Sequence, residues 1–585
     1  MKKIISVILV AVMLSLAMTS LVSCGGSDDA GPQISVYLGE EVYDFDPTDY
    51  YVSDNAAELM SLLFEPLFRI TDGGKLENAA ASGYSVDQEE RKITITLKES
   101  YWSDKSRVTA EDFIYSWRNI LLEPNNANPA AALLYDIEGA MEIKSGEASS
   151  VYNLGVEKTG VYELTVTYRE GADYNQLLRN LAALPTSPVK QDVHENSPAT
   201  WTKNLVTAVT NGPFMLGTVN HELGELTVER NPGYHQSPYL VDKTGQVTPD
   251  KLVTFIVEGE SRALTYSDIT AKTVFYLGEA PLSDLAANKA NAKTADALSA
   301  YSYVFNTEKP LFAIKEVRRA LSMVIDRTAI ANAVTFGDAA TGFLPSGVLD
   351  IGTNKSFSTG TLISADAKLN EAKNLLSTVD LSGIDKNIKI SVNNDERSLK
   401  IAELVKASWE SLNIGLTVTV VPVGAVTATI TDFTSGEQTV IYDSGIQVLV
   451  KDAAKGICNF DVVGIDWQMY SEDAMVALMS FTSSLNGNGV DYSTGKARTH
   501  ISGWWSYEYD ALMNAAQSAG DKATRAEKLH AAEAVLADAA PIVPILFNTN
   551  YAFVSTDLSG LKTDIYGNFS FVKVSQKDYK KYIEE

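Results

Sequence analysis

The sequence predicts a mixed α/β protein with two or three domains behind a short N-terminal segment. Strand-like and helix-like segments alternate irregularly along the chain, which is typical of α/β and α+β proteins. A hydrophobic fraction of 45% with 9% aromatic residues fits a soluble globular protein. Removal of residues 1–23 from the 585-residue chain leaves 562 residues, enough for two or three domains with large cores.

The N-terminus has the pattern of a secretory signal. Lys2 and Lys3 precede an apolar run over residues 4–18, and small residues follow that run. The run is shorter than the roughly 20 residues of a transmembrane helix, and no stop-transfer pattern follows it. We therefore expect residues 1–23 to be a signal peptide.

Residues 21–24, Leu-Val-Ser-Cys, resemble the bacterial lipobox, in which the cysteine receives a diacylglyceryl group and becomes the new N-terminus. The Gly-, Ser- and Asp-rich residues behind Cys24 suit a flexible tether over residues 24–33. Several acyl chains on one residue anchor firmly. We expect a chain held by lipid at Cys24 on the outer face of the cytoplasmic membrane. The alternative is an ordinary signal peptide with an incidental cysteine.

Charge and cysteine content narrow the possible partners. The formal net charge is −26, and residues 1–23 carry two lysines and no acid, so their removal makes it −28. Such a large net negative charge argues against nucleic acid or an anionic membrane surface as the main partner. Of the two cysteines, acylation of Cys24 leaves Cys458 without a disulfide partner. Cys458 stands in an apolar, strand-like context and is expected to be buried.

Periodicity and capping place several elements. Thr109 and Asp112 form an acidic capping box, apolar residues follow at helical spacing, and Pro124 ends the pattern. The same periodicity predicts helices over about residues 315–334, 397–413 and 522–539. Strands are expected over residues 416–421, stopping at Pro422, and over the apolar stretch 541–554.

The sequence contains no recognisable catalytic or metal-binding motif. The five histidines are scattered, without the i, i+4 spacing of a helical metal pair. No G-x-S-x-G motif occurs. GVDYSTGKA resembles a phosphate-binding loop, but five residues rather than four separate Gly489 and Gly495, and Ala497 replaces the required Ser or Thr. We therefore expect neither an enzyme nor a bound metal or cofactor.

Motifs along nearly the whole mature chain point to one family. The most recognisable is YWSDKSRVTAEDFIYSW at residues 101–117. In chain order, the others are YDFDPTD, LLFEPLFRITDGGKLENAAASGYSV, TNGPFML, VERNPGYH, YSYVFNTEKPLFAIKEVRRALSMVIDR, FDVVGIDW, EYDALMNAA and APIVPIL. Together they resemble the extracytoplasmic solute-binding proteins of peptide and nickel ABC transporters, the oligopeptide-binding family.

The resemblance implies a two-lobed, periplasmic-binding-protein-like fold with an extra inserted domain and a ligand cleft between the lobes. The chain then crosses twice between lobes. Lobe I is expected from residues 34–64, 189–300 and 541–585, its inserted domain from 65–188, and lobe II from 301–540. Residues 431–447 belong to a segment that is longer than usual for the family, and we expect it to line or cover the cleft.

In peptide-binding members of the family the ligand lies as an extra β-strand between the lobes. On this sequence, the resemblance implies strand partners at Tyr51, Val52 and Ser53 on one lobe and at residues 464–467, including Gly464, on the other. For Tyr51, Val52 and Trp467 the alternative is a core position.

Relatives often carry an Asp three residues after the tryptophan of this strand, where it pairs with the peptide's ammonium. Here that position is Tyr470, and the nearby carboxylates are Asp466, Glu472 and Asp473. Strand alternation sends Asp466 and Trp467 to opposite faces. We favour Asp466 in the cleft with Trp467 in the core; otherwise Glu472 or Asp473 serves the ammonium, or the ligand has none.

The resemblance implies a monomeric, lipid-anchored receptor, not an enzyme, that binds oligopeptides and delivers them to the permease subunits of an ABC transporter. Within the binding class, the ligand could instead be a nickel chelate, haem or an oligosaccharide, although the scarcity of histidine counts against bare metal. A surface hydrolase or adhesin on a similar scaffold is the alternative from another class.

Overall fold

The computed structural model describes residues 33–39, 42–48, 54–71, 73–122, 128–198, 200–203, 207–220, 225–235, 251–255, 263–358, 360–431, 438–454, 456–483, 485, 490–491, 496–497 and 501–578. None of the helices in these ranges combines the length and the apolar character that a membrane span requires.

A mixed central sheet runs through the molecule. Among the described residues it has eleven strands, in the order β17-β16-β20-β12-β23-β11-β1-β10-β9-β8, with β13 also paired to β23. Their bounds are β1 Gln33–Tyr37, β8 Phe214–Asn220, β9 Glu225–Arg230, β10 Lys251–Phe255, β11 Tyr276–Leu277, β12 Lys293–Phe305, β13 Asp338–Ala339, β16 Asn387–Asn393, β17 Thr417–Val423, β20 Val462–Gln468 and β23 Ile542–Val554.

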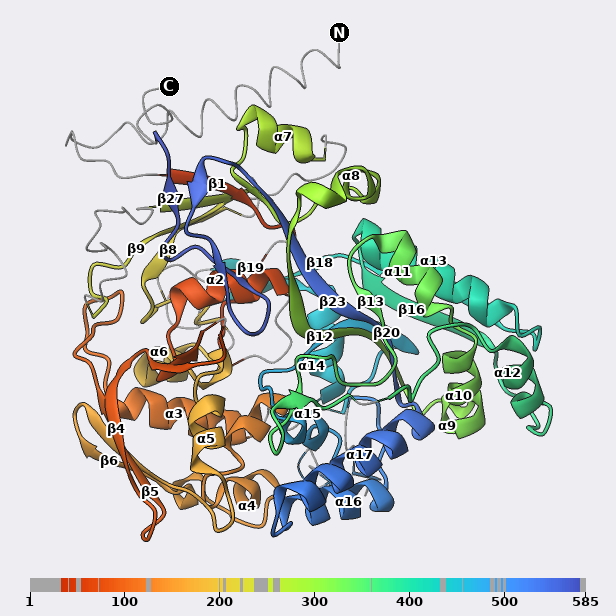
Figure 1. Cartoon of the computed structure of the whole chain (residues 1–585), viewed down its shortest axis with the longest axis horizontal. Coiled ribbons are helices and arrows are strands. Elements are labelled where there is room, and N and C mark those ends of the chain that lie inside the picture. Colours follow the sequence, from red (N-terminus) through yellow and green to blue (C-terminus); the bar gives the residue numbers. More distant parts are fainter. Residues whose placement is uncertain are drawn as a thin grey trace.

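Two long strands, β12 and β23, connect the two halves of this sheet. They pair with each other antiparallel over most of their length. β12 also pairs with β20, whereas the end of β23 pairs with β11. Figure 1 shows both strands crossing the middle of the molecule. We call the part built on β1 and β8–β11 the first lobe and the part built on β16, β17 and β20 the second lobe. The two-lobed α/β fold expected from the sequence is confirmed; the exact domain boundaries stay a proposal.

A separate four-stranded antiparallel sheet, β4-β5-β7-β6, lies at the lower left of Figure 1 beside α3–α5. Its strands are β4 Ala81–Asp87, β5 Lys92–Leu97, β6 Val156–Gly160 and β7 Glu163–Thr167. The short paired strands are β2 Phe68–Ile70, β3 Leu76–Asn78, β14 Leu349–Asp350, β15 Lys355–Ser356, β18 Ala425–Thr431, β19 Gln438–Ser444, β21 Val490–Asp491, β22 Lys496–Ala497, β24 Leu558–Ser559, β25 Lys562–Thr563, β26 Phe569–Ser570 and β27 Ser575–Gln576.

Helices cover the sheets. Their bounds are α2 Asp54–Leu63, α3 Ala110–Leu121, α4 Ala140–Lys144, α5 Tyr174–Asn180, α6 Gln191–Asn196, α7 Tyr266–Ala271, α8 Leu282–Asn288, α9 Pro310–Ala313, α10 Lys315–Met323, α11 Arg327–Val334, α12 Leu369–Leu376, α13 Glu396–Glu410, α14 Gly445–Ala454, α15 Ala474–Met479, α16 Tyr507–Gln517 and α17 Lys522–Ala539. The 3-10 helices are η1 Pro129–Leu134, η2 Val151–Asn153, η3 Leu184–Thr186 and η4 Lys289–Asn291.

Local signals placed several helices correctly. The Thr109 N–H donates to the Asp112 carboxylate at 2.7 Å, which forms the capping box expected at the start of α3. α17 has the predicted bounds, and α13 begins one residue before the predicted start. Pro124 lies outside the described residues.

Other local expectations were wrong. The helix predicted over residues 315–334 is two helices, because Asp326 caps a new helix by accepting a hydrogen bond from Ala329 N at 2.8 Å. Pro422 does not end β17, which runs on to Val423. Cys458 is only half-buried and precedes β20 instead of lying in a strand.

Candidate ligand-binding cleft

A cavity of about 200 Å³ lies between the lobes, beside the crossing strands. It is lined from the first lobe by Glu58, Tyr276, Gly278, Glu279, Ala280, Leu282 and Leu285, from β23 by Asn548, Thr549, Asn550 and Tyr551, and from the second lobe by Val334, Phe336, Asn393, Asp395, Glu396, Arg397, Ser398, Ser444, Ile446, Gln447, Val450, Ile465 and Asp466. Pockets for small ligands usually measure about 300–1,000 Å³. An oligopeptide therefore requires the lobes to separate before it enters.

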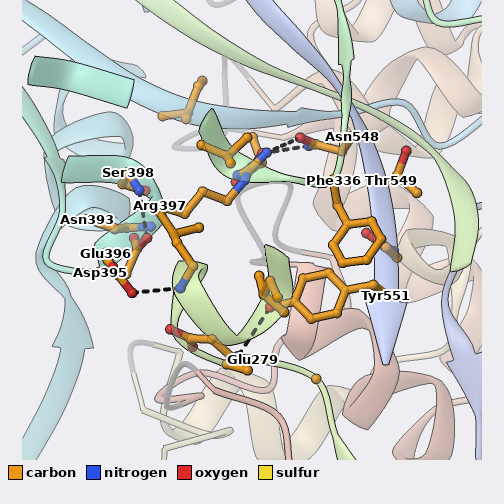
Figure 2. Close-up of a pocket in the computed structure, with 18 of the residues that line it drawn as sticks. Glu279, Phe336, Asn393, Asp395, Glu396, Arg397, Ser398, Asn548, Thr549 and Tyr551 are labelled. Carbon is orange, nitrogen blue, oxygen red and sulfur yellow. Dashed lines mark hydrogen bonds and ion pairs between the residues drawn. The ribbon is translucent and has the colours of Figure 1, made fainter. Parts of the chain in front are cut away.

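Asn548 organises one wall of the cavity. Its amide nitrogen donates to Asp466 at 2.6 Å and to Ser299 at 2.8 Å, and its amide oxygen accepts from Arg397 at 2.6 Å. Arg397 also lies 3.9 Å from Asp466, and Figure 2 shows its side chain extending to Asn548. Ser299 and Asn548 lie where the register of β12 with β23 shifts. The two charged side chains of this wall, Arg397 and Asp466, are thus hydrogen-bonded to the crossing strand β23.

The part of the cavity wall formed by the start of α13 and the first lobe is acidic. Asp395 caps α13 by accepting a hydrogen bond from Ser398 N at 2.7 Å, and Glu396 accepts one from Leu282 N of the first lobe at 2.9 Å. Burial raises the pKa of Asp395. Burial and then the charges of Asp395 and Glu396 raise the pKa of Glu279 to about 7. The described residues contain no group of three or more His, Cys, Asp and Glu side chains arranged to hold a metal ion.

β20 presents a strand edge to the space between the lobes. Its antiparallel register with β12 runs from Val462 to Gln468, whereas its parallel register with β16 covers Val462 and Val463. The following residues, from Gly464 to Asp466, lie beyond the end of that parallel pairing. A Cβ at Gly464 would come within 2.6 Å of the Tyr301 hydroxyl, so glycine is what allows the close packing of this strand.

The region of the four-stranded sheet is also in contact with the second lobe. Gln176 and Asn180 of α5 hydrogen-bond the Ser471 hydroxyl at 3.3 and 2.9 Å, and Arg179 forms an ion pair with Glu472. These contacts hold the second lobe against the region of the four-stranded sheet, as expected of a closed arrangement.

A second set of contacts joins the lobes through charge. Lys203 pairs with Asp44 of the first lobe at 3.5 Å and with Asp443, the last residue but one of β19, next to α14. Lys451 of α14 reaches Asp44 at 3.4 Å. Burial alone would raise the pKa of Asp44, but the charges of Lys451 and Lys203 hold it below its usual value.

Comparison with known proteins identifies the chain. Residues 75–489 match the family described as "Bacterial extracellular solute-binding proteins, family 5 Middle". The chain belongs to this family of extracellular solute-binding proteins. One relative is the oligopeptide-binding protein OppA of Bacillus subtilis, 26% identical over 511 residues, which cover 85% of this chain and 84% of the relative. Another is the periplasmic murein peptide-binding protein MppA of Escherichia coli, 28% identical over 516 residues, with 85% and 84% coverage.

Solved structures share the fold of this solute-binding protein. OppA of Listeria monocytogenes bound to peptide has a TM-score of 0.76 at 18% identity, covering 94% of this chain and 99% of that one. E. coli MppA gives 0.74 at 23% identity, with 94% and 99% coverage, whereas its unliganded open form gives 0.53 at 23% identity, with 94% and 98% coverage. The lower score for the open form agrees with the closed contacts described above.

The structure separates the residues that the sequence placed together in β20. Asp466 lines the cavity, and Trp467, on the opposite face, is 1% exposed. The Trp467 ring stacks on Phe481 at 5.1 Å between centroids and meets the edge of Phe343 at 6.0 Å. This is the arrangement we favoured from strand alternation, with Asp466 facing the cleft and Trp467 in the core.

Tyr470 and Asp473 lie away from this cavity. Tyr470 is buried, and its carbonyl accepts a hydrogen bond from the Tyr566 hydroxyl at 3.1 Å. Asp473 is 2% exposed, caps α15 and pairs with Arg525 at 2.6 Å. It lines a second cavity of about 170 Å³, between the region of the four-stranded sheet and the second lobe.

Of the remaining predicted positions, some lie outside the described residues and others lie at the cavity. Tyr51, Val52 and Ser53 and the proposed anchor Cys24 lie outside the described residues. The segment that includes residues 431–447 does reach the cleft, because Ser444, Ile446 and Gln447 line the cavity. Its β19 residue Tyr442 also stacks on Tyr43 of the first lobe.

Sequence reasoning missed much of the cavity. Glu279, Arg397 and the β23 residues Asn548 and Tyr551 come from three distant parts of the chain, and each is an ordinary residue in its local pattern. The one usable signal was local: Asp395 stands two residues before the start of the helix that the periodicity predicted, close to a typical capping position.

Proposed function

We propose that this protein is a non-enzymatic receptor that binds oligopeptides between its lobes and delivers them to an ABC permease. Membership of a solute-binding family supports a binding role, and the names of relatives such as B. subtilis OppA supply the peptide class. The observation that carries the proposal is the edge of β20, which borders an interlobe cavity beyond its pairing with β16.

A strand edge suits a peptide ligand because main-chain hydrogen bonds hold any sequence. In our proposal, the peptide backbone pairs with Gly464 to Trp467 on the second lobe and with Tyr51 to Ser53 on the first. Asp466 is the member of the proposed set whose side chain lines the cavity, so it contacts the ligand directly. Trp467, Tyr470 and Asp473 do not line this cavity. Separation of the lobes about β12 and β23 admits the ligand, and closure retains it.

Titration calorimetry with a pool of free tetra- to octapeptides tests the proposal. We expect saturable heat with the pool, and native mass spectrometry of the purified protein should show retained masses that fragment as peptides. The alternatives within the binding class are a nickel chelate, haem and an oligosaccharide. Absence of heat with every peptide pool, together with a retained non-peptide mass, would refute peptide binding.

We also propose that Cys24 carries the lipid anchor. The lipobox-like residues 21–24 and the polar tether behind them support it. We expect wild-type protein to partition into detergent with the mass of a diacylated mature chain, and a Cys24→Ser variant to stay unprocessed or be released. An unmodified, freely released wild-type chain would contradict the anchor.

A further inference from the structure

The cavity between the lobes has an unbalanced charge. Among its described lining residues the acids are Glu58, Glu279, Asp395, Glu396 and Asp466, and the one basic side chain is Arg397. Arg397 lies beside Asp466 and Asn548 on one wall. Glu279 of the first lobe and Asp395 and Glu396 of the second lobe share the other part of the cavity, as Figure 2 shows.

Four of these carboxylates accept hydrogen bonds from other residues of the protein. Glu58 accepts hydrogen bonds from the Tyr276 hydroxyl at 3.0 Å and from Phe569 N at 3.2 Å. Asp395 caps α13, Glu396 accepts from Leu282 N, and Asp466 accepts from Asn548.

Glu279 is different. Its carboxylate has no hydrogen-bond or ion-pair partner among the residues that the structure describes, although the residue is half-buried and packs against Gly39. The charged and titratable groups that face it are Tyr37 on β1, Tyr551 on β23, and Asp395 and Glu396 at the start of α13. A half-buried carboxylate next to two others is costly unless a cation joins them.

We propose that the cleft selects peptides that carry a cationic group, an ammonium or a guanidinium, and that this group lies between Glu279 of the first lobe and Asp395 and Glu396 of the second. The inference rests on the proposed peptide-binding function and names the ligand class. A cation held from both lobes replaces carboxylate repulsion by attraction, so it favours closure. The N-terminus and a Lys or Arg side chain offer the same chemistry.

Four hexapeptide pools distinguish these sources. Each pool has lysine or norleucine at one fixed position, no other basic residue, and a free or an acetylated N-terminus. We expect wild-type protein at pH 8 to bind cationic pools on the order of tenfold more tightly than the acetylated norleucine pool. Preference for the acetylated lysine pool assigns the cation to a side chain, and preference for the free norleucine pool assigns it to the N-terminus.

Two variants connect the preference to Glu279. Glu279→Gln should abolish it while binding of the neutral pool persists. Glu403→Gln is the matched control, because it removes the same charge from the exposed face of α13, where the side chain of Glu403 is 59% exposed. Equal binding of neutral and cationic pools by wild-type protein, or a preference that survives Glu279→Gln, would overturn the inference and leave the proposed function standing. Failure of every pool to bind would overturn both.

The pH dependence gives an independent readout. Since burial and the neighbouring charges raise the pKa of Glu279 to about 7, Glu279 is mostly protonated at pH 6 and must lose its proton to hold a cation. Wild-type affinity for cationic pools should fall about tenfold from pH 8 to pH 6, and the Glu279→Gln variant should show no such fall. A raised carboxyl pKa lowers stability as pH rises from about 4.5 to about 7. Glu279→Gln should therefore be at least as stable as wild type at pH 8, and loss of preference cannot be ascribed to unfolding.

Discussion

A Trp467→Ala variant is expected to lose about 3–5 kcal/mol of unfolding free energy, the usual cost of truncating a fully buried aromatic side chain. Trp467 is 1% exposed and packs between Phe481 and Phe343. The cavity left by the indole cannot be filled without moving Phe481 and Phe343, which pack against it. Denaturant titration followed by circular dichroism measures the loss as a lower midpoint.

Two controls give this experiment its meaning. Trp467→Phe keeps an aromatic ring in the stack and should retain most of the stability. Asp466→Asn, on the opposite face of β20, should leave the unfolding free energy within about 1 kcal/mol of the wild-type value. If Trp467→Ala kept full stability but lost peptide binding, the tryptophan would be a ligand contact and the packing account would be wrong.

A Lys203→Met variant is expected to bind peptides on the order of 100-fold more weakly. Lys203 is 8% exposed and joins Asp44 to Asp443 across the lobes. Removing one partner of a buried ion pair typically costs about 3–5 kcal/mol, because the remaining charge stays desolvated. Opening of the lobes lets both carboxylates regain water, so the cost falls on the closed arrangement and lowers apparent affinity. Calorimetry with the free peptide pool measures the change.

The matched control is Lys190→Met. Lys190 pairs with Asp104 and Asp192, neither of which belongs to the second lobe, so these ion pairs do not join the lobes. The side chain of Lys190 is 14% exposed. Its loss should leave peptide affinity unchanged.

Because Lys451 and Lys203 hold the pKa of Asp44 below its usual value of 3.8, the contribution of Asp44 to closure is present above that pH and is lost on further acidification. Equal peptide affinity of Lys203→Met and wild type would show that the ion pairs of Lys203 do not contribute to closure of the lobes.

Local structure was predictable where the signal is local. The Thr109–Asp112 capping box and the bounds of α17 follow from spacing alone. The two-helix structure of residues 315–334 was missed because apolar periodicity does not mark Asp326, the residue that caps the second helix. The next residue, Arg327, is fully buried although its charge predicts exposure. In the structure it donates to the carbonyls of Pro544 and Ser322 at 2.7 and 3.0 Å. A buried, hydrogen-bonded arginine follows from tertiary contacts that periodicity does not contain.

One part of the cleft was predictable because it depends on a local signal. Alternation along a strand places Asp466 and Trp467 on opposite faces whatever surrounds them, and the resemblance to a family supplied the strand. The remaining wall depends on Glu279, Arg397 and Asn548, which the crossing of β12 and β23 brings together from distant positions. In a chain with 74 acidic residues, nothing local distinguishes Glu279 from the others.

Hydrogen–deuterium exchange of β20 tests the central claim most directly, namely that a peptide binds between the lobes alongside this strand. Wild-type protein would be compared with and without a saturating pool of free peptides, with peptic fragments that cover Val462–Gln468 followed by mass spectrometry. We predict slower exchange of the amides from Gly464 to Gln468 when peptide is bound, since the strand edge beyond the β16 pairing becomes hydrogen-bonded. Unchanged exchange throughout β20, while calorimetry shows the peptide bound, would place the ligand elsewhere and contradict the account.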